Sequence, residues 1–285
     1  MRVAVCIDQT LAPDAVVTLD RARRSVSVAA PTYTSNPTDD WAVAESIRLD
    51  GANHIGIFIV ATGQADPLLR SYLAAGSDEA IRVWDPALEE ADDFTKARVL
   101  AAAAQRWSAD VVMCGGRIGE NEARLVGPVV AELLGLPQVT AVVRLKADGA
   151  ALVAQRRVEA FVETVWCPLP AVVAIDRGRS LPYPTLPSRL RARTASIDVW
   201  DLPVLGMSAG SLPSLPIEVT AVSTPKPRRK TPVDSRPALD RTIDLLLGRL
   251  QGGAGSGGGD ALLNGDDPRT AERVVARCLP ILRTV

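Results

Sequence analysis

The residues best suited to chemistry lie in one stretch, from Ala109 to Thr140, where a short apolar run is followed by two glycines and a polar loop. The run Val111 to Cys114 is typical of a buried strand, and Gly115 and Gly116 allow the backbone to turn sharply because they have no Cβ. Main-chain N–H groups at such a turn, close to the start of a helix, favour the binding of an anion. Because open α/β sheets bind ligands at the carboxyl ends of their strands, we expect an anion-binding site in this stretch.

Acid–base chemistry here would depend on Glu120 and Glu122, two carboxylates of the polar loop. Carboxylates in the first turn of a helix more often cap free N–H groups than transfer protons. The stretch matches neither GxxxxGK[ST] nor GxGxxG, so a tight strand-to-helix turn without a ligand is an equal alternative. His54, the sole histidine, directly precedes an apolar run and is expected to have a structural or surface role. We therefore predict no catalytic residues and no self-contained enzyme.

The four cysteines, Cys6, Cys114, Cys167 and Cys278, are far apart and form no CxxC pair. This spacing favours buried thiols in a reducing compartment over disulfides or a metal site. The formal net charge of −1 provides no general basic field for nucleic acid. No apolar run is long enough to span a membrane, and the N-terminal residues enter a strand rather than a signal peptide. We expect a cytoplasmic protein that binds no nucleic acid.

Short apolar runs alternate with helical patterns as far as Ile175. We predict buried strands at residues 2–8, 55–61, 80–84, 111–114 and 171–175, and helices at residues 41–49, 67–75, 95–107 and in the segment that ends at Leu134. Asp93 is expected to cap the third of these helices. A hairpin is expected within residues 13–30, and further β structure at residues 141–145, 152–158 and 162–166. This alternation predicts an α/β fold with a doubly wound, mostly parallel sheet covered on both faces.

The chain after the last of these strands is rich in proline and glycine. Three prolines within residues 182–187 stiffen a loop in an extended form. A short basic helix is predicted at residues 188–193, a surface connection at 201–216, a last strand at 217–223, helices at 237–250 and 268–282, and a flexible glycine-rich linker between these two helices. We predict three parts: an α/β domain at residues 1–187, a C-terminal extension at 188–251, and the linker with an extra helix at 252–285.

Two segments resemble signature segments of electron transfer flavoprotein β subunits, a family that includes the FixA proteins. They are Arg156 to Val173, which reads RRVEAFVETVWCPLPAVV, and Tyr183 to Pro187, which reads YPTLP. Asn36-Pro37 before a helix and Gly127-Pro128 also fit the family. The resemblance covers about residues 2–250 and implies a sheet like that of the adenine-nucleotide α-hydrolases.

The resemblance implies a heterodimer with an α subunit, in which FAD lies between the two chains. It implies AMP, or a second FAD in electron-bifurcating members, within the β subunit. Electrons would come from flavin dehydrogenases and pass to a membrane quinone oxidoreductase. Carried over by position, the nucleotide contacts would be Ala4, Asn36, Pro37, Thr38, Asp39, Thr62, Gly115, Gly116, Arg117, Ile118, Gly119, Glu120, Asn121, Glu122, Ala123, Arg124, Leu125 and Val126. Ala4 and Thr62 are expected to end adjacent core strands.

The resemblance further implies that the stiff proline loop is the docking element for partner dehydrogenases. Tyr183, Leu186, Arg189 and Arg191 would form this element, with Leu186 as its apolar anchor and the arginines attracting acidic partners. A buried loop leucine is the alternative for Leu186. The loop at residues 115–122 departs from the usual family sequence, which leaves AMP, FAD or an empty site open. A nucleotide-binding α/β hydrolase or ligase and an AMP-responsive regulatory module are the rival functions.

Overall fold

Strands that are apolar on both faces form the centre of the molecule. The computed structural model describes residues 1–20, 22, 25–28, 31–89, 91–116, 125–212, 220 and 222–223, and residues 1–223 fall in one compact unit. Every residue of the strands β8 (Val111–Gly115) and β12 (Ala171–Ile175) is buried, as expected of parallel strands covered on both sides. The predicted strand at 217–223 lies largely outside the described residues, and the helices at 237–250 and 268–282 and their linker lie wholly outside them. The domain boundaries after residues 187 and 251 therefore stay predictions.

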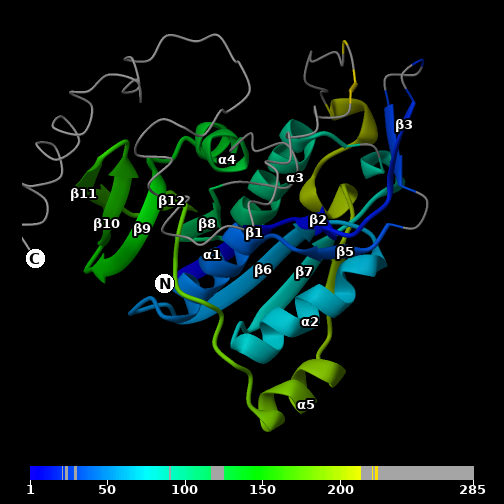
Figure 1. Cartoon of the computed structure of the whole chain (residues 1–285). Helices are drawn as coiled ribbons and strands as arrows, with labels where there is room; N and C mark the ends of the chain where they lie inside the picture. Colours follow the sequence, from blue (N-terminus) through cyan, green and yellow to red (C-terminus); the bar gives the residue numbers. More distant parts are fainter. Residues whose placement is uncertain are drawn as a thin grey trace, which may run out of the picture. The chain divides into compact units, whose positions relative to one another are not determined.

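The described residues form one nine-stranded sheet in the order β11-β10-β9-β12-β8-β1-β6-β7-β13 (Figure 1). Its strands are β1 (Arg2–Ile7), β6 (His54–Val60), β7 (Glu79–Val83), β8 (Val111–Gly115), β9 (Gln138–Asp148), β10 (Ala151–Val158), β11 (Phe161–Pro168), β12 (Ala171–Ile175) and β13 (Asp198–Trp200). All neighbours from β9 to β13 along this order are parallel, whereas β10 is antiparallel to both β9 and β11. The prediction of a doubly wound, mostly parallel sheet is confirmed.

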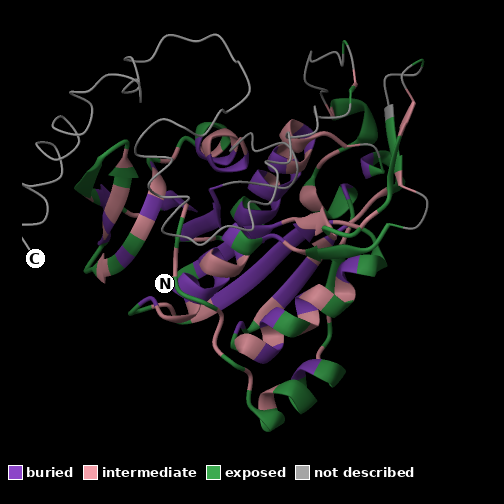
Figure 2. Ribbon diagram, viewed as in Figure 1, coloured by how far each residue is buried: buried purple, intermediate pink, exposed green. Residues whose placement is uncertain are grey.

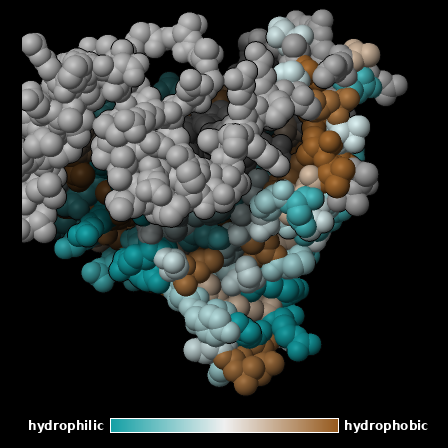
Figure 3. All heavy atoms as spheres, in the orientation of Figure 1, coloured by the Kyte–Doolittle hydropathy of each residue, from teal (hydrophilic) through white to brown (hydrophobic). Residues whose placement is uncertain are grey.

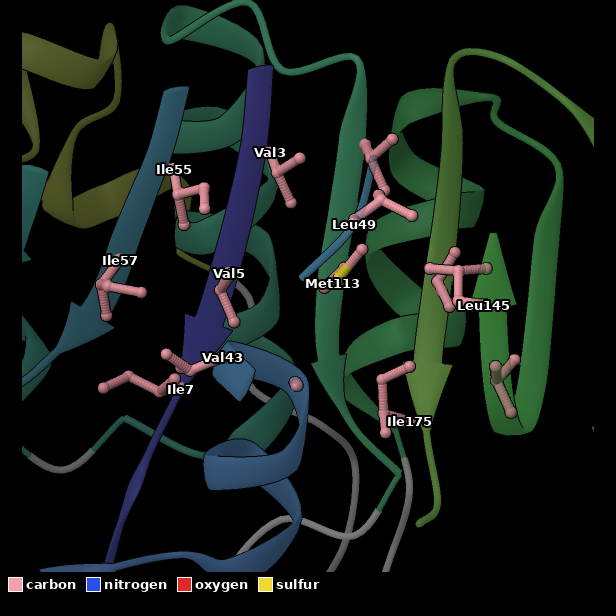
Figure 4. Close-up of a cluster of buried hydrophobic side chains, with 14 of the residues drawn as sticks. Val3, Val5, Ile7, Val43, Leu49, Ile55, Ile57, Met113, Leu145 and Ile175 are labelled. Atoms are coloured by element: carbon pink, nitrogen blue, oxygen red, sulfur yellow. The ribbon is translucent and has the colours of Figure 1, made fainter. Parts of the chain in front are cut away.

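Helices cover both faces of the sheet. Helices α1 (Pro37–Ile47) and α2 (Asp66–Ala75) share one core with Val3 and Val5 of β1. Helices α3 (Asp93–Arg106) and α4 (Val126–Leu134) share the other core with Ala4 and Cys6. Because side chains alternate along a strand, β1 contributes to both cores in turn. Figure 2 shows the buried central strands, and Figure 4 shows the core on the α1 side.

Smaller elements lie outside the main sheet. Strand β2 (Gln9–Leu11) pairs with β5 (Tyr33–Ser35), and β3 (Val17–Asp20) pairs with β4 (Ser25–Val28) as the predicted hairpin. Helix α5 (Leu186–Thr194) packs on α2. The 3₁₀ helices are η1 (Gly63–Ala65), η2 (Pro86–Leu88), η4 (Pro203–Leu205) and η5 (Ala209–Ser211). In the part of the chain that the structure describes, no helix is long and apolar enough to cross a bilayer.

Capping side chains decide where several helices begin. Helix α1 starts four residues before the predicted Trp41 because the Asn36 side chain accepts the Thr38 N–H at 3.2 Å. The cap of α3 is Asp92, whose Oδ1 accepts the Thr95 N–H at 2.7 Å, so the prediction of Asp93 as the cap is wrong by one residue. Helix α5 starts at Leu186, two residues earlier than predicted, with Thr185 as its cap.

The strand order reverses between β1 and β8. From β1 the chain proceeds to β6 and β7 on one side, and then returns to β8 and β12 on the other. At such a switch point neighbouring connections leave in opposite directions and open a crevice at the carboxyl ends of the strands. The candidate site is therefore sought next to Ile7 and Gly115.

Candidate functional site

The Asp39 carboxylate joins the carboxyl ends of β1 and β8. Its Oδ2 accepts the Asp8 N–H at 2.9 Å and its Oδ1 accepts the Gly115 N–H at 3.0 Å. Asp39 is completely buried in the first turn of α1. Burial raises the pKa of this carboxyl well above its ordinary value, while the two N–H donors act in the opposite direction. One side chain thus ties a helix start to both strands of the switch point.

Gly115 lets helix α1 approach β8 closely. A Cβ at this position would overlap Asp39 Oδ1 and Thr38 Oγ1, and it would lie 2.9 Å from the main-chain nitrogen of Asp39. The N–H of Gly116 donates to the Ile175 carbonyl at 2.6 Å. The N–H groups of both glycines therefore donate within the fold. That Gly115 and Gly116 contact a nucleotide stays a prediction.

A cavity of about 500 Å³ opens at the carboxyl ends of β1, β6 and β7. Its walls come from the residues that directly follow these strands, from β5 and from the first turn of α3. They include Asp8, Gln9, Tyr33, Val60, Ala61, Thr62, Gln64, Trp84, Leu88 and Lys96. We call this cavity the edge crevice. Its lining mixes apolar and aromatic side chains with polar and charged ones, among them Asp8, Glu89 and Lys96.

Lys96 supplies positive charge inside the edge crevice. Its Nζ lies 2.9 Å from Asp8 Oδ2, and both side chains are mostly buried. A smaller hollow lined by Asp8, Lys96 and Val126 connects this ion pair to the start of α4. Helix α4 begins beside this hollow, with Leu125 at its N-cap position and Pro128, which has no N–H, in its first turn. Asp8 is the salt-bridge partner of Lys96, and Glu89 adds a second carboxylate to the lining of the edge crevice.

The nucleotide contacts that the sequence predicts lie at different places in the structure. Thr62 lies exposed in the wall of the edge crevice, Asn36 caps α1, and Thr38 and Asp39 lie next to Gly115. Leu125 and Val126 form the start of α4, with Val126 in the smaller hollow. Pro37 is the first residue of α1. Residues 117–124 lie outside the described residues.

The expectation that Ala4 ends its strand is wrong. Ala4 is fully buried in the middle of β1, between Gly56 and Val112, and has no surface to offer a ligand. Cys6, further along the same strand, is closer to the switch point. Burial, together with the charge of Asp39, raises the pKa of the Cys6 thiol to about 12.

Sequence reasoning missed Asp8, Tyr33, Trp84 and Lys96. Asp8 and Trp84 directly follow β1 and β7, so the rule that ligands bind at carboxyl ends of strands could have identified them. Tyr33 and Lys96 reach the edge crevice only through the packing of β5 and α3 around it.

His54 has the structural role that its position predicts. Its ring stacks on Trp107 at a centroid distance of 5.5 Å, and its Nε2 lies 3.1 Å from Glu79 Oε2. These residues lie at the opposite ends of the strands from the edge crevice. Within the described ranges, His, Cys, Asp and Glu side chains form no group of three that could hold a metal ion.

The residues predicted to dock a partner form an exposed tip at the start of α5. Tyr183 is 85% exposed, Leu186 is 70% exposed and Leu190 is 53% exposed, and apolar atoms gather at this tip (Figure 3). The Arg189 guanidinium lies 5.0 Å from the centre of the Tyr183 ring, and Arg191 is also exposed. The alternative of a buried Leu186 is therefore excluded. Leu186 is the first residue of a helix rather than part of an extended loop.

Comparisons with known proteins agree with this geometry. The family model described as Electron transfer flavoprotein domain matches residues 25–205. The chain is 31% identical over 201 residues to an electron transfer flavoprotein subunit beta of Thermoanaerobacterium thermosaccharolyticum, covering 68% of this chain and 77% of the relative. For the subunit beta of Sus scrofa the identity is 30%, covering 76% of this chain and 86% of the relative. For that of Clostridium acetobutylicum it is 28%, covering 84% and 94%. Together with the parallel sheet, these matches show that the chain belongs to the electron transfer flavoprotein β-subunit family.

Proposed function

We propose that this chain pairs with an electron transfer flavoprotein α subunit to form an FAD-containing heterodimer. The heterodimer accepts electrons from flavin dehydrogenases and passes them to a membrane quinone oxidoreductase. Family membership supports the role in electron transfer, and the dispersed cysteines favour a cytoplasmic location. The chain acts as a carrier subunit rather than as a self-contained enzyme.

The edge crevice is the proposed site for AMP, or for a second FAD, in this subunit. Val60, Ala61 and Trp84 provide apolar and aromatic surface for an adenine ring. Lys96, the positively charged residue of the crevice lining, is the proposed partner of the phosphate. The cavity of about 500 Å³ lies in the range of ligand pockets, roughly 300–1,000 Å³. The residues present therefore fit a nucleotide.

The FAD shared with the α subunit supplies the redox chemistry when it is bound. The residues of this chain contribute binding and positioning. Asp39 holds the ends of β1 and β8 together beneath the crevice, and Lys96 balances negative charge within it. Neither group needs to exchange a proton with a substrate for this task.

The exposed Leu186 is the single observation that carries the proposal of partner docking. An apolar side chain on a helix start behind proline residues is held out before binding, so little conformational entropy is lost on docking. The nearby Arg189 and Arg191 are suited to a partner whose apolar socket is bordered by carboxylates. A monomeric nucleotide enzyme has no need for such an exposed apolar tip.

The heterodimer is tested by co-expressing this chain with an α subunit from the same source. We expect a stable flavin-containing complex, from which denaturation releases FAD and a second nucleotide that mass spectrometry identifies as AMP or FAD. A flavin-free monomer, or ATP turnover by the isolated chain, would contradict the proposal.

Docking is tested with Leu186→Ala and the control Leu133→Ala, which truncates a leucine of α4 that is 43% exposed. The donor dehydrogenase is the member of a panel of purified flavin dehydrogenases that reduces the wild-type heterodimer fastest. Loss of about three buried methylene equivalents at ~0.8 kcal/mol each weakens docking by on the order of fiftyfold. We expect a corresponding rise in the KM for the Leu186→Ala heterodimer, with an unchanged flavin spectrum. Loss of flavin, or equal KM values for the two variants, would refute the docking role.

A further inference from the structure

Helix α5 has too little core packing to hold its own position. Of its nine residues only Ala192 is buried, while Leu186 and Leu190 are exposed. A helix of this length is marginal in water without outside support. Leu181 before α5 and Ile197 after it pack against the core on the α1 and α2 side. Further contacts must therefore fix the orientation of α5 between Leu181 and Ile197.

Arg70 of α2 holds the C-terminal end of α5. Its Nη1 donates to the carbonyl oxygens of Ala192 at 2.8 Å, Arg193 at 3.1 Å and Ala195 at 2.9 Å. Carbonyl groups in the last turn of a helix lack partners within the helix. A guanidinium at this end also interacts favourably with the negative end of the helix dipole. The Arg70 side chain thus provides hydrogen-bond donors for the carbonyl groups at the end of α5 and fixes the distance of α5 from the sheet.

The segment before α5 is held by α1. Arg179 forms two side-chain hydrogen bonds with the buried Glu45, from Nε to Oε1 at 3.0 Å and from Nη2 to Oε2 at 3.1 Å. Arg48 Nη2 donates to the Ser180 carbonyl at 2.8 Å. Gly178 packs so closely on α1 that an added Cβ would lie 3.0 Å from Trp41 Cβ. The chain before α5 is therefore held by α1, and the C-terminal end of α5 is held by α2.

We propose that Arg70 is a positioning residue for partner docking, which holds α5 in the orientation that presents Leu186. The inference rests on the proposed docking role of Leu186. Without the Arg70 guanidinium the last turn of α5 loses its partners, and the helix can pivot about the fastened loop. A partner must then order this helix as it binds. Ordering even one residue lowers affinity by on the order of tenfold.

The test uses the heterodimer with Arg70→Gln, Arg70→Lys and the control Arg98→Gln on α3. The KM and kcat of the donor dehydrogenase are measured with the heterodimer as the varied substrate, and hydrogen exchange is followed in residues 186–195. For Arg70→Gln we expect about a tenfold higher KM, an unchanged kcat and flavin spectrum, and faster exchange in α5. Arg70→Lys, which retains a cation at the helix end, should recover part of the loss.

The double variant Leu186→Ala with Arg70→Gln separates the two proposals. If Arg70 acts through Leu186, its substitution should change KM less in the Leu186→Ala background than in the wild type. If the effects of the two substitutions on KM are fully additive, or if Arg70→Gln has the same KM as Arg98→Gln, the positioning role of Arg70 is wrong. In either case a raised KM for Leu186→Ala would still support the docking proposal. If Leu186→Ala leaves KM unchanged, docking itself is wrong.

Discussion

Replacing Gly115 with alanine tests the junction between α1 and β8. The new methyl group would overlap the side-chain oxygens of Thr38 and Asp39 and would lie 2.9 Å from the Asp39 main-chain nitrogen. A side-chain rotation cannot relieve the contact with the main chain. Either α1 moves away from the sheet, or β8 shifts and the hydrogen bond from the Gly115 N–H to Asp39 is lost.

The cost follows from these contacts. Overpacking a dense site by a methyl group costs about 1–3 kcal/mol. Leaving a buried hydrogen-bonding group without its partner costs about 1–3 kcal/mol more. We expect the free energy of unfolding to fall by about 2–6 kcal/mol, a large share of the roughly 5–15 kcal/mol that stabilises a typical domain. The corresponding fall in Tm is on the order of 10 °C.

The assay is urea unfolding of the full chain followed by circular dichroism. Gly63→Ala is the matched control, because a Cβ there meets only Arg82 Nη2 at 3.9 Å, and its effect should stay within about 1 kcal/mol. Gly115→Ala should unfold at a clearly lower urea concentration and should also retain less nucleotide in the heterodimer. Equal midpoints for the two variants would refute the argument that Gly115 is required by the approach of α1.

Two pH dependences follow from buried carboxyl groups. Burial raises the pKa of Asp39 above 3.8, so its stabilising contribution is present at lower pH and is lost as pH rises through the raised value. The unfolding free energy of the wild type minus that of Asp39→Asn should therefore fall as pH rises from about 4 through the raised pKa, and a constant difference would contradict this. Burial alone would raise the pKa of Glu45, but the hydrogen bonds and charge of Arg179 outweigh burial and hold it below 4.5. The free energy of unfolding of the wild type should exceed that of Glu45→Gln above about pH 4.5, and this difference should disappear as pH falls further. Urea midpoints of the two proteins that stay equally far apart down to about pH 3 would contradict this prediction.

The sequence by itself determined the layers of the fold. Runs such as Val111 to Cys114 and Ala171 to Ile175 predicted buried parallel strands because a strand covered on both faces needs no polar side chains. Turn and cap residues predicted the hairpin and the region of most helix starts, since these signals act within a few residues of the chain. Errors of a few residues occurred where a cap such as Asn36 or Asp92 lies before the apolar pattern.

Only the tertiary structure decided what the individual site residues do. Gly115 was predicted to allow a sharp turn of the backbone, yet its missing Cβ also admits Asp39, which lies 76 positions away in the chain. Ala4 was placed at a strand end that lies further along at Ile7. Arg70 reaches carbonyl groups more than a hundred residues distant, and no local pattern marks it. Periodicity and turn chemistry describe neighbours along the chain, whereas these contacts depend on which elements the sheet brings together.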